Sequence, residues 1–251
     1  MKPHILVSND DGIASPGLRS LVDALPPDRF ALTVVAPEHP QSARGCAHSH
    51  GDKWVRWSKT TMGEVDWISV GDTPATCVSV ALRVCEVKPD LVISGINFGE
   101  NLGLNLFYSG TIGAAWEAAM SGVPALAVSL ELPPNLHFTH DKSVSFEVAG
   151  HFAVRTAEKI LRERPPTLLW NLNVPTAATL DSSIREARVA QNRWNYPIPR
   201  ETRGNNVSSG EVRFEFDPTG EVFGPESDVT LLRQGYVTLT ALNHLTFPWA
   251  E

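Results

Sequence analysis

Long hydrophobic runs are missing from this sequence. No segment approaches the roughly 18 consecutive apolar residues that a membrane-spanning helix requires. The amino terminus also lacks the extended apolar stretch and the small-residue cleavage site that a signal peptide carries. From these absences we predict a cytoplasmic protein without a membrane partner.

Cysteine and positive charge are also scarce. The three cysteines, Cys46, Cys77 and Cys85, lack C-x-x-C spacing, which argues against a zinc motif, a redox motif and a disulfide scaffold. The formal net charge is -7, whereas a general nucleic-acid-binding protein carries a basic face. We therefore expect no stable nucleic-acid partner. A bound metal ion can reverse the local potential, so this charge does not exclude a small anionic substrate.

Short apolar runs alternate with helical patterns as far as about residue 171. This alternation predicts an α/β fold with a mostly parallel sheet, because each crossover helix returns the chain to a parallel neighbour. The expected strands are residues 4–8, 32–36, 65–70, 90–93, 125–130 and 168–171. The expected helices are residues 16–25, 73–84, 111–120 and 142–162.

The pattern changes after about residue 173. Segments 184–194, 211–216 and 236–240 alternate in polarity, which is typical of half-exposed strands in hairpins. The polar segment 191–210 is expected to be a loop or an extended arm. We divide the chain into an α/β core at 1–175 and a C-terminal region at 176–251, a hairpin arm with a closing helix and strand. Because half-exposed strands can pair with another chain, we expect this region to pack on the core and on a partner subunit.

The adjacent acids Asp10 and Asp11 form the sharpest local feature. They directly follow the first apolar strand, at the edge where open α/β sheets place their ligand crevice. Neighbouring side chains on a strand point to opposite faces, so both acids can reach one ion only where the strand has ended. Gly12 favours a turn at that point. A solvated turn with a capping aspartate is the alternative, but the apolar strand before it favours a functional pair.

Ser42 and Asn97 follow two further strands of the expected sheet. Each alone is more often an ordinary loop residue. Because parallel strands end at one edge, the fold would bring this hydroxyl and this carboxamide to the two carboxylates. Such an all-oxygen set suits Mg²⁺ or Mn²⁺ better than zinc, with Co²⁺ and Ni²⁺ as further candidates. We expect one divalent cation per subunit, with the ligands Asp10, Asp11, Ser42 and Asn97.

The small residues Ser109, Gly110 and Thr111 stand at the start of an expected helix. Free backbone N–H groups at a helix N-terminus bind anions, and the two hydroxyls add donors. A tight turn with a helix cap is the alternative reading. Beside a metal site, the turn predicts a cradle for a phosphate group.

Four motifs together resemble the SurE survival-protein family: residues 5–12 (ILVSNDDG), 90–101 (DLVISGINFGEN), 108–115 (YSGTIGAA) and 235–242 (GYVTLTAL). Their combination is specific, and it runs from the first strand to the last. The resemblance implies a metal-dependent phosphatase of the kind described as 5′- and 3′-nucleotidases, some with exopolyphosphatase activity. It also implies a Rossmann-like core and a C-terminal extension exchanged between subunits in a homodimer or homotetramer.

The resemblance also assigns the site residues. The family's metal ligands fall on Asp10, Asp11, Ser42 and Asn97. Its phosphate-contacting turn falls on Ser109, Gly110 and Thr111. The residues close to the same substrate site are Asn9, Asn97 and Asn101.

The sequence departs from the family near two of these positions. Gln41 and Ala43 flank Ser42 where many relatives carry an arginine and a glycine. Thr76 stands where an aspartate is usual. These departures bear on substrate preference rather than on the metal site.

The expected reaction is the metal-assisted hydrolysis of nucleoside monophosphates or other small phosphomonoesters. Asp10 and Asp11 are the candidate catalytic residues. One of them could accept a proton from the attacking water, or a carboxylate could attack phosphorus directly. The residues leave both routes open.

Two other classes match part of the pattern. Phosphatases that form an aspartyl-phosphate usually carry Asp-x-Asp and a later lysine, but no lysine occurs here between Lys88 and Lys142. Receivers and nucleotide-binding regulators also carry paired acids after their first strand, but this chain is much longer than such a module. A turnover assay with and without EDTA separates an enzyme from a binding protein.

Overall fold

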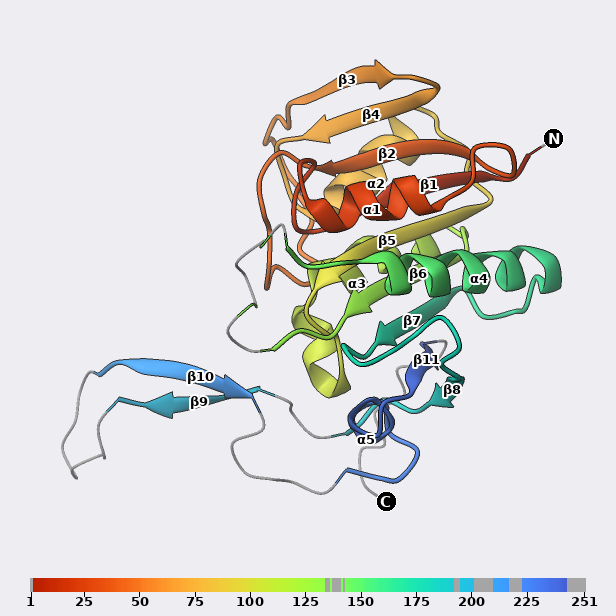
Figure 1. Ribbon diagram of the computed structural model, residues 1–251. Helices are drawn as coiled ribbons and strands as arrows, with labels where there is room; N and C mark the ends of the chain where they lie inside the picture. Colours follow the sequence, from red (N-terminus) through yellow and green to blue (C-terminus); the bar gives the residue numbers. More distant parts are fainter. Residues whose placement is uncertain are drawn as a thin grey trace.

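The computed structural model describes residues 2–133, 136, 141, 143–191, 195–200, 210–216 and 223–242. Its centre is a nine-stranded sheet with the strand order β3-β4-β2-β1-β5-β6-β7-β11-β8 (Figure 1). The parallel strands at its centre are β4 (Val65–Val70), β2 (Ala31–Pro37), β1 (His4–Ser8), β5 (Leu91–Phe98), β6 (Ala125–Leu130) and β7 (Leu169–Val174). This arrangement confirms the predicted α/β class and the mostly parallel sheet.

Helices cover both faces of the sheet. On one face α1 (Pro16–Ala24) contacts α4 (Glu147–Glu163), and on the other α2 (Pro74–Arg83) contacts α3 (Gly110–Met120) (Figure 1). The middle residues of β1 are fully buried, as expected for a strand covered on both sides. The strands therefore have few exposed positions except at their ends, where the loops of the candidate site begin.

Three elements differ from the sequence prediction. The edge strand β3 (Trp57–Met62) pairs antiparallel with β4, and all its residues are exposed, so no buried apolar face signalled it. The helix predicted from residue 142 begins at Glu147, and residue 142 lies outside the described residues. A 3-10 helix, η1 (Gly103–Tyr108), was not predicted.

The C-terminal strands divide between two sheets. β8 (Ile184–Ala187) and β11 (Val237–Ala241) extend the main sheet, whereas β9 (Asn195–Pro199) and β10 (Val212–Phe216) form an antiparallel pair that projects from it (Figure 1). The short helix α5 (Asp228–Arg233) precedes β11.

The prediction that residues 236–240 form a half-exposed hairpin strand was wrong. β11 lies between β7 and β8, and Val237, Thr238 and Thr240 are buried. The threonines made the segment look polar on one side, but that side is covered. The segment predicted as a polar arm, 191–210, contains β9, while 192–194 and 201–209 lie outside the described residues.

The three cysteines are unpaired thiols: Cys77 is buried, Cys85 is half-buried and Cys46 is exposed. Within the described part of the chain, no helix has the length and apolar character needed to cross a membrane.

Candidate metal and phosphate site

Asp10 and Asp11 lie just beyond the end of β1. The strand ends at Ser8, and Gly12 turns the chain with a φ of 94°, a conformation that favours glycine. The two acids therefore lie outside the strand, where the alternation of side chains no longer separates them. Asp10 is only 3% exposed and Asp11 only 6%.

Asp10 contacts the start of α3. Its Oδ1 accepts a hydrogen bond of 2.6 Å from the Thr111 hydroxyl. Burial raises the pKa of the Asp10 carboxyl, and hydrogen bonds from Thr111 and from backbone N–H groups, including that of Gly110, offset part of this rise. A Cβ on Gly110 would lie 2.7 Å from the Asp10 Cβ, so glycine lets the helix begin this close to the carboxylate. Three of the predicted site residues are thus in one cluster.

Asp11 is joined to the end of β5. The Phe98 backbone N–H donates a hydrogen bond of 3.3 Å to its Oδ2. Burial raises the pKa of Asp11 well above its ordinary value, and the neighbouring charge of Asp10 raises it further. Two adjacent buried carboxylates are costly unless a cation neutralises them, so the pair suits a divalent ion.

Asn97 lies at the same edge of the sheet as the two acids. It precedes Phe98, whose N–H binds Asp11, so the ends of β1 and β5 meet here. The Asn97 Nδ2 donates to the Gly99 carbonyl at 2.8 Å, which leaves Oδ1 as the atom of this side chain that can ligate a cation. The predicted convergence of Asn97 on the acids is therefore present.

Ser42 is carried by the loop that follows β2. The Gln41 N–H donates to the Asp10 carbonyl at 2.7 Å, and the Gly45 N–H donates to the Tyr108 carbonyl at 2.9 Å. These two bonds hold the half-buried Ser42 beside Asp10, against the turn that precedes α3. Its role as a ligand stays a prediction.

Asn9 and Ser109, which adjoin Asp10 and Gly110 in the chain, add polar atoms near the cluster. The Asn9 Nδ2 donates to the Gly12 carbonyl at 3.1 Å, while its buried Oδ1 has no hydrogen-bond partner among the described residues. Such an orphaned oxygen beside two carboxylates fits a position that a ligand completes. The Ser109 Oγ caps α3 by accepting from the Ile112 N–H at 3.2 Å, which leaves its hydrogen free for donation.

Asn101 is placed differently from the other predicted residues. Its Nδ2 donates to the Ser129 Oγ at 2.8 Å, and its N–H donates to the Asn173 Oδ1 at 2.8 Å. The Asn171 and Asn173 amides both donate to its carbonyl. Asn101 thus ties the loop after β5 to the sheet, and its amide carries a second N–H besides the one donated to Ser129.

The residues that anchor Asn101 were missed by the sequence analysis. Ser129 is the last residue but one of β6, and Asn171 and Asn173 lie on one face of β7. A possible signal was the pair of asparagines two positions apart in an otherwise apolar strand, LWNLNV. Buried asparagines in a central strand need partners, and the loop after β5 supplies them.

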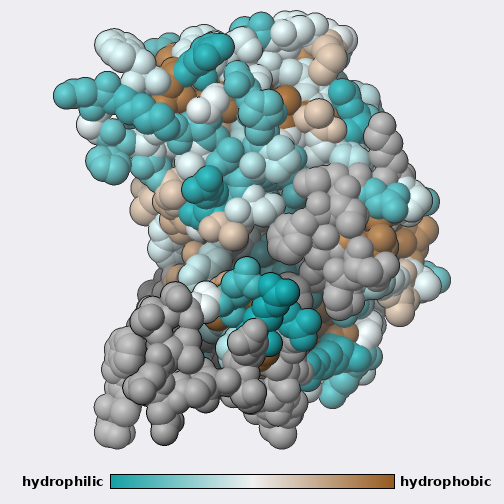
Figure 2. Space-filling model, turned by 90° about the vertical axis from the view of Figure 1, so that its left-hand side faces the viewer, coloured by the Kyte–Doolittle hydropathy of each residue, from teal (hydrophilic) through white to brown (hydrophobic). Residues whose placement is uncertain are grey.

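The donor set at this edge consists of two carboxylates and neutral oxygens. Among the described residues, no group of three or more His, Cys, Asp and Glu side chains could hold a metal ion. The carboxylates of Asp10 and Asp11 and the neutral oxygens of Ser42 and Asn97 are of the kind that Mg²⁺ and Mn²⁺ prefer. Figure 2 faces the edge at which the parallel strands end, and hydrophilic residues predominate in the central part of its described surface.

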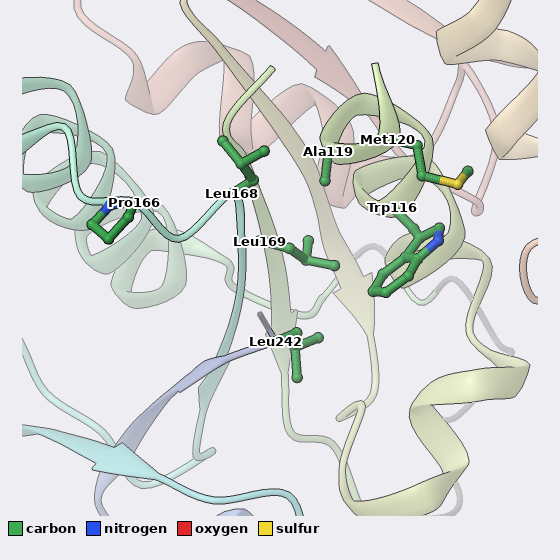
Figure 3. Close-up of a pocket in the computed structure, with 7 residues that line it drawn as sticks. All are labelled: Trp116, Ala119, Met120, Pro166, Leu168, Leu169 and Leu242. Carbon is green, nitrogen blue, oxygen red and sulfur yellow. The ribbon is translucent and has the colours of Figure 1, made fainter. Parts of the chain in front are cut away.

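A separate hollow lies at the opposite edge of the sheet. It has a volume of about 390 Å³ and is apolar, with Trp116, Met120, Leu168 and Leu242 in its wall (Figure 3). Its described lining residues include no charged side chain for a phosphate group, so the cluster around Asp10 is the better candidate for a phosphomonoester site.

The chain resembles proteins of one family in sequence and in structure. The family model "Survival protein SurE" matches residues 5–196. A 5′-nucleotidase SurE from Chloroflexus aggregans is 36% identical over 252 residues, which cover 94% of this chain and 91% of that protein. A 5′-nucleotidase SurE from Methanocaldococcus jannaschii is 39% identical over 195 residues, 75% of this chain and 73% of that protein. The crystal structure of the SurE protein from Aquifex aeolicus aligns with a TM-score of 0.74 at 28% identity, over 97% of this chain and 95% of that one.

Proposed function

The chain belongs to the SurE family, and on that premise we propose that it hydrolyses nucleoside 5′-monophosphates to nucleosides and phosphate. Relatives named 5′-nucleotidase support a nucleotide phosphomonoesterase. The observation that carries the proposal is the contact between Asp10 and Thr111. It joins a pair of buried carboxylates to the N-terminus of a helix, so a cation and a phosphate can bind side by side.

We propose that Asp10, Asp11, Ser42 and Asn97 hold one divalent cation, Mg²⁺ or Mn²⁺. The buried acid pair and the orphaned Asn9 oxygen support such a site. When bound, the ion would supply Lewis-acid stabilisation of negative charge on a phosphoryl oxygen.

The turn before α3 binds the phosphoryl group in this proposal. The Ser109 hydroxyl is the donor to a phosphoryl oxygen, and the dipole of α3 favours the negative charge. The Gly110 and Thr111 N–H groups donate to the Asp10 carboxylate, so they hold it against this turn. Thr111 has a different role, because its hydroxyl donates a hydrogen bond to Asp10. It fixes the orientation of that carboxylate next to the phosphate.

Water attacks phosphorus in the proposed reaction, and one of the two aspartates accepts its proton. The bond from phosphorus to the 5′ oxygen breaks, and the nucleoside leaves as an alcohol once that oxygen has taken up a proton. Direct attack by a carboxylate is the competing route, and it would leave an aspartyl-phosphate on the chain. Rapid acid quenching with ³²P-labelled substrate separates the two, because only the second route leaves label on the protein.

The exposed arm formed by β9 and β10 is the proposed contact between subunits of a homodimer or homotetramer. Val212 and Phe214 on β10 are 59% and 64% exposed. They are two positions apart and therefore lie on one face of the strand, where two exposed apolar side chains indicate a contact surface. Their replacement by serine should lower the oligomeric mass measured by light scattering. An unchanged mass would contradict this contact.

The function is tested by phosphate release from a panel of nucleoside 5′- and 3′-monophosphates and polyphosphate, with Mn²⁺ or Mg²⁺ present. We expect turnover of the 5′-monophosphates and a loss of at least about 100-fold in Asp10→Asn with the fold retained. Asp66→Asn is the matched control. Asp66, on β4, forms an ion pair with Lys59 away from the site, so this substitution should leave activity unchanged. A fully active Asp10→Asn enzyme would overturn the proposed site.

A further inference from the structure

Asp228, the first residue of α5, is a buried carboxylate outside the site described above. It has no exposed surface. Its Oδ1 accepts hydrogen bonds from the backbone N–H groups of Ala190 and Val229, and its Oδ2 accepts one from Gly103, each at 2.9 Å. Gly103 is 125 residues away in the sequence, so one side chain connects the C-terminal region to the loop after β5.

The surroundings of Asp228 are apolar. A small hydrophobic cluster joins the loop after β5 to the C-terminal region through Leu102, Ala190, Phe223, Val229 and Leu232. Burial raises the pKa of Asp228 to about 6, although backbone N–H groups lower it. The carboxyl is therefore mostly ionised at neutral pH and acts purely as an acceptor, which suits three N–H donors.

Gly103 lies where its position affects the phosphate site. It begins η1, which leads directly into Ser109 and the start of α3. The last residue of η1, Tyr108, accepts at its carbonyl the bond from Gly45, in the loop that carries Ser42. A shift of η1 would therefore move both the phosphate turn and the Ser42 loop.

We propose that Asp228 is a positioning residue for the phosphate site, which holds η1 so that the turn at Ser109–Thr111 stays against Asp10. The sheet anchors the loop at Asn101, and Asp228 anchors it two residues later from the other side. The C-terminal region thereby contributes to substrate binding without touching the substrate. This inference rests on the proposed phosphatase function of the site.

A purely structural role would make Asp228 important only for the stability of α5. The matched control is Ser227→Ala, which removes the α5 cap, a bond of 3.1 Å from the Thr230 N–H to the Ser227 Oγ. That change weakens the same helix end but leaves the bond between Asp228 and Gly103 in place. If the two variants behave alike, Asp228 only stabilises α5.

The experiment compares the full-length wild type with Asp228→Asn, Asp228→Ala and Ser227→Ala. The readouts are the KM for p-nitrophenyl phosphate, the inhibition constant of inorganic phosphate, Mn²⁺ affinity, and hydrogen exchange of peptides covering residues 99–112. For Asp228→Asn we expect a rise of about tenfold in KM and in the phosphate constant, with faster exchange in 99–112 and unchanged Mn²⁺ affinity. Ser227→Ala should keep the wild-type KM and exchange.

Wild-type kinetics and wild-type exchange in a folded Asp228→Asn protein would overturn the proposal. If the wild type itself shows no turnover, the proposed function fails, and the exchange of residues 99–112 still tests the anchor. If neither Asp228 variant folds, hydrogen exchange of the Gly103 amide in the wild type tests the anchor. It should be protected to the same degree as the Val229 amide, and exchange at the rate of an open loop would contradict the anchor.

Discussion

At the scale of single residues, the Asp10 carboxylate depends on a donor that is 101 positions away in the sequence. The sequence was sufficient to predict Asp10, Asp11 and Gly12, because a buried apolar strand that stops at two acids and a glycine is a local pattern. It could not predict that the Thr111 hydroxyl would point at Asp10. That contact depends on how α3 packs against the end of β1, and Thr111 had been read only as a phosphate donor.

Replacement of Thr111 by valine tests this contact. The isosteric change leaves the buried Asp10 Oδ1 without its donor, so we expect a loss of about 1.5–3 kcal/mol in the free energy of unfolding. Phosphatase activity should fall because Asp10 is no longer oriented. The control is Thr240→Val, since the buried Thr240 hydroxyl has no hydrogen-bond partner among the described residues. Equal stability and activity of the two variants in urea unfolding and turnover assays would refute the role of Thr111.

Ala43, next to Ser42, has a φ of 60°, in the left-handed region that favours glycine. The left-handed conformation destabilises the folded protein by about 1–2 kcal/mol when the residue is alanine. Glycine removes this strain, but its more flexible unfolded state offsets part of the gain in stability. We expect Ala43→Gly to raise the free energy of unfolding by about 0.5–1 kcal/mol. Ala47→Gly in the same loop, at a position without positive φ, should lower it. Thermal denaturation of both variants checks the prediction, which fails if both changes destabilise equally.

At the scale of elements, the loop after β2 is fixed to the start of α2 through Asp72. This carboxylate accepts hydrogen bonds from Lys53, from Ser49 at 2.6 Å and from Thr76 at 3.2 Å. The Thr76 hydroxyl also accepts the Ser49 N–H at 3.0 Å. Thr76, which stands where an aspartate is usual in the family, thus helps to anchor the loop that carries Ser42.

Asp72 gives the protein a specific acid sensitivity. Burial alone would raise the pKa of this carboxyl, but the bonds from Lys53, Ser49 and the Thr73 N–H hold it well below its ordinary value of 3.8. A depressed pKa in the folded state means that the stabilisation is present above pH 3.8 and is lost as the pH falls further.

We therefore expect Asp72→Asn to lower the free energy of unfolding at pH 7 by about 2 kcal/mol. The difference from the wild type should shrink below about pH 4. Urea unfolding of both proteins between pH 3 and pH 7 measures this difference. A difference that is constant with pH, or that grows toward acid, would show that the ionised Asp72 is not the source of the stabilisation.

Elements were predictable where one face or both were apolar. The central strands and the helices between them have this property, and the structure confirms them. β3 has only exposed residues, and β11 buries its threonines between β7 and β8, so both depend on neighbours that are distant in the sequence. Local patterns cannot report such neighbours.

At the scale of the whole molecule, the parallel sheet gathers the site from loops spread over a hundred residues. The acids follow β1, Ser42 follows β2, Asn97 is the last residue but one of β5 and the phosphate turn opens α3. The predicted convergence of these residues follows from parallel topology alone, because all such strands end at one edge. The support from β7 and α5 was not predictable in the same way, since it comes from single buried polar side chains.

The most direct test of this account is phosphate release from a nucleoside 5′-monophosphate by the wild-type enzyme after removal of divalent ions with EDTA, followed by stepwise addition of Mn²⁺ or Mg²⁺. We expect phosphatase activity to vanish when the divalent ions are removed and to return with a stoichiometry of one ion per subunit. In Asp10→Asn we expect no recovery of activity at the same ion concentrations. Full activity in the metal-free wild type would contradict the assignment of Asp10 and Asp11 as a metal site.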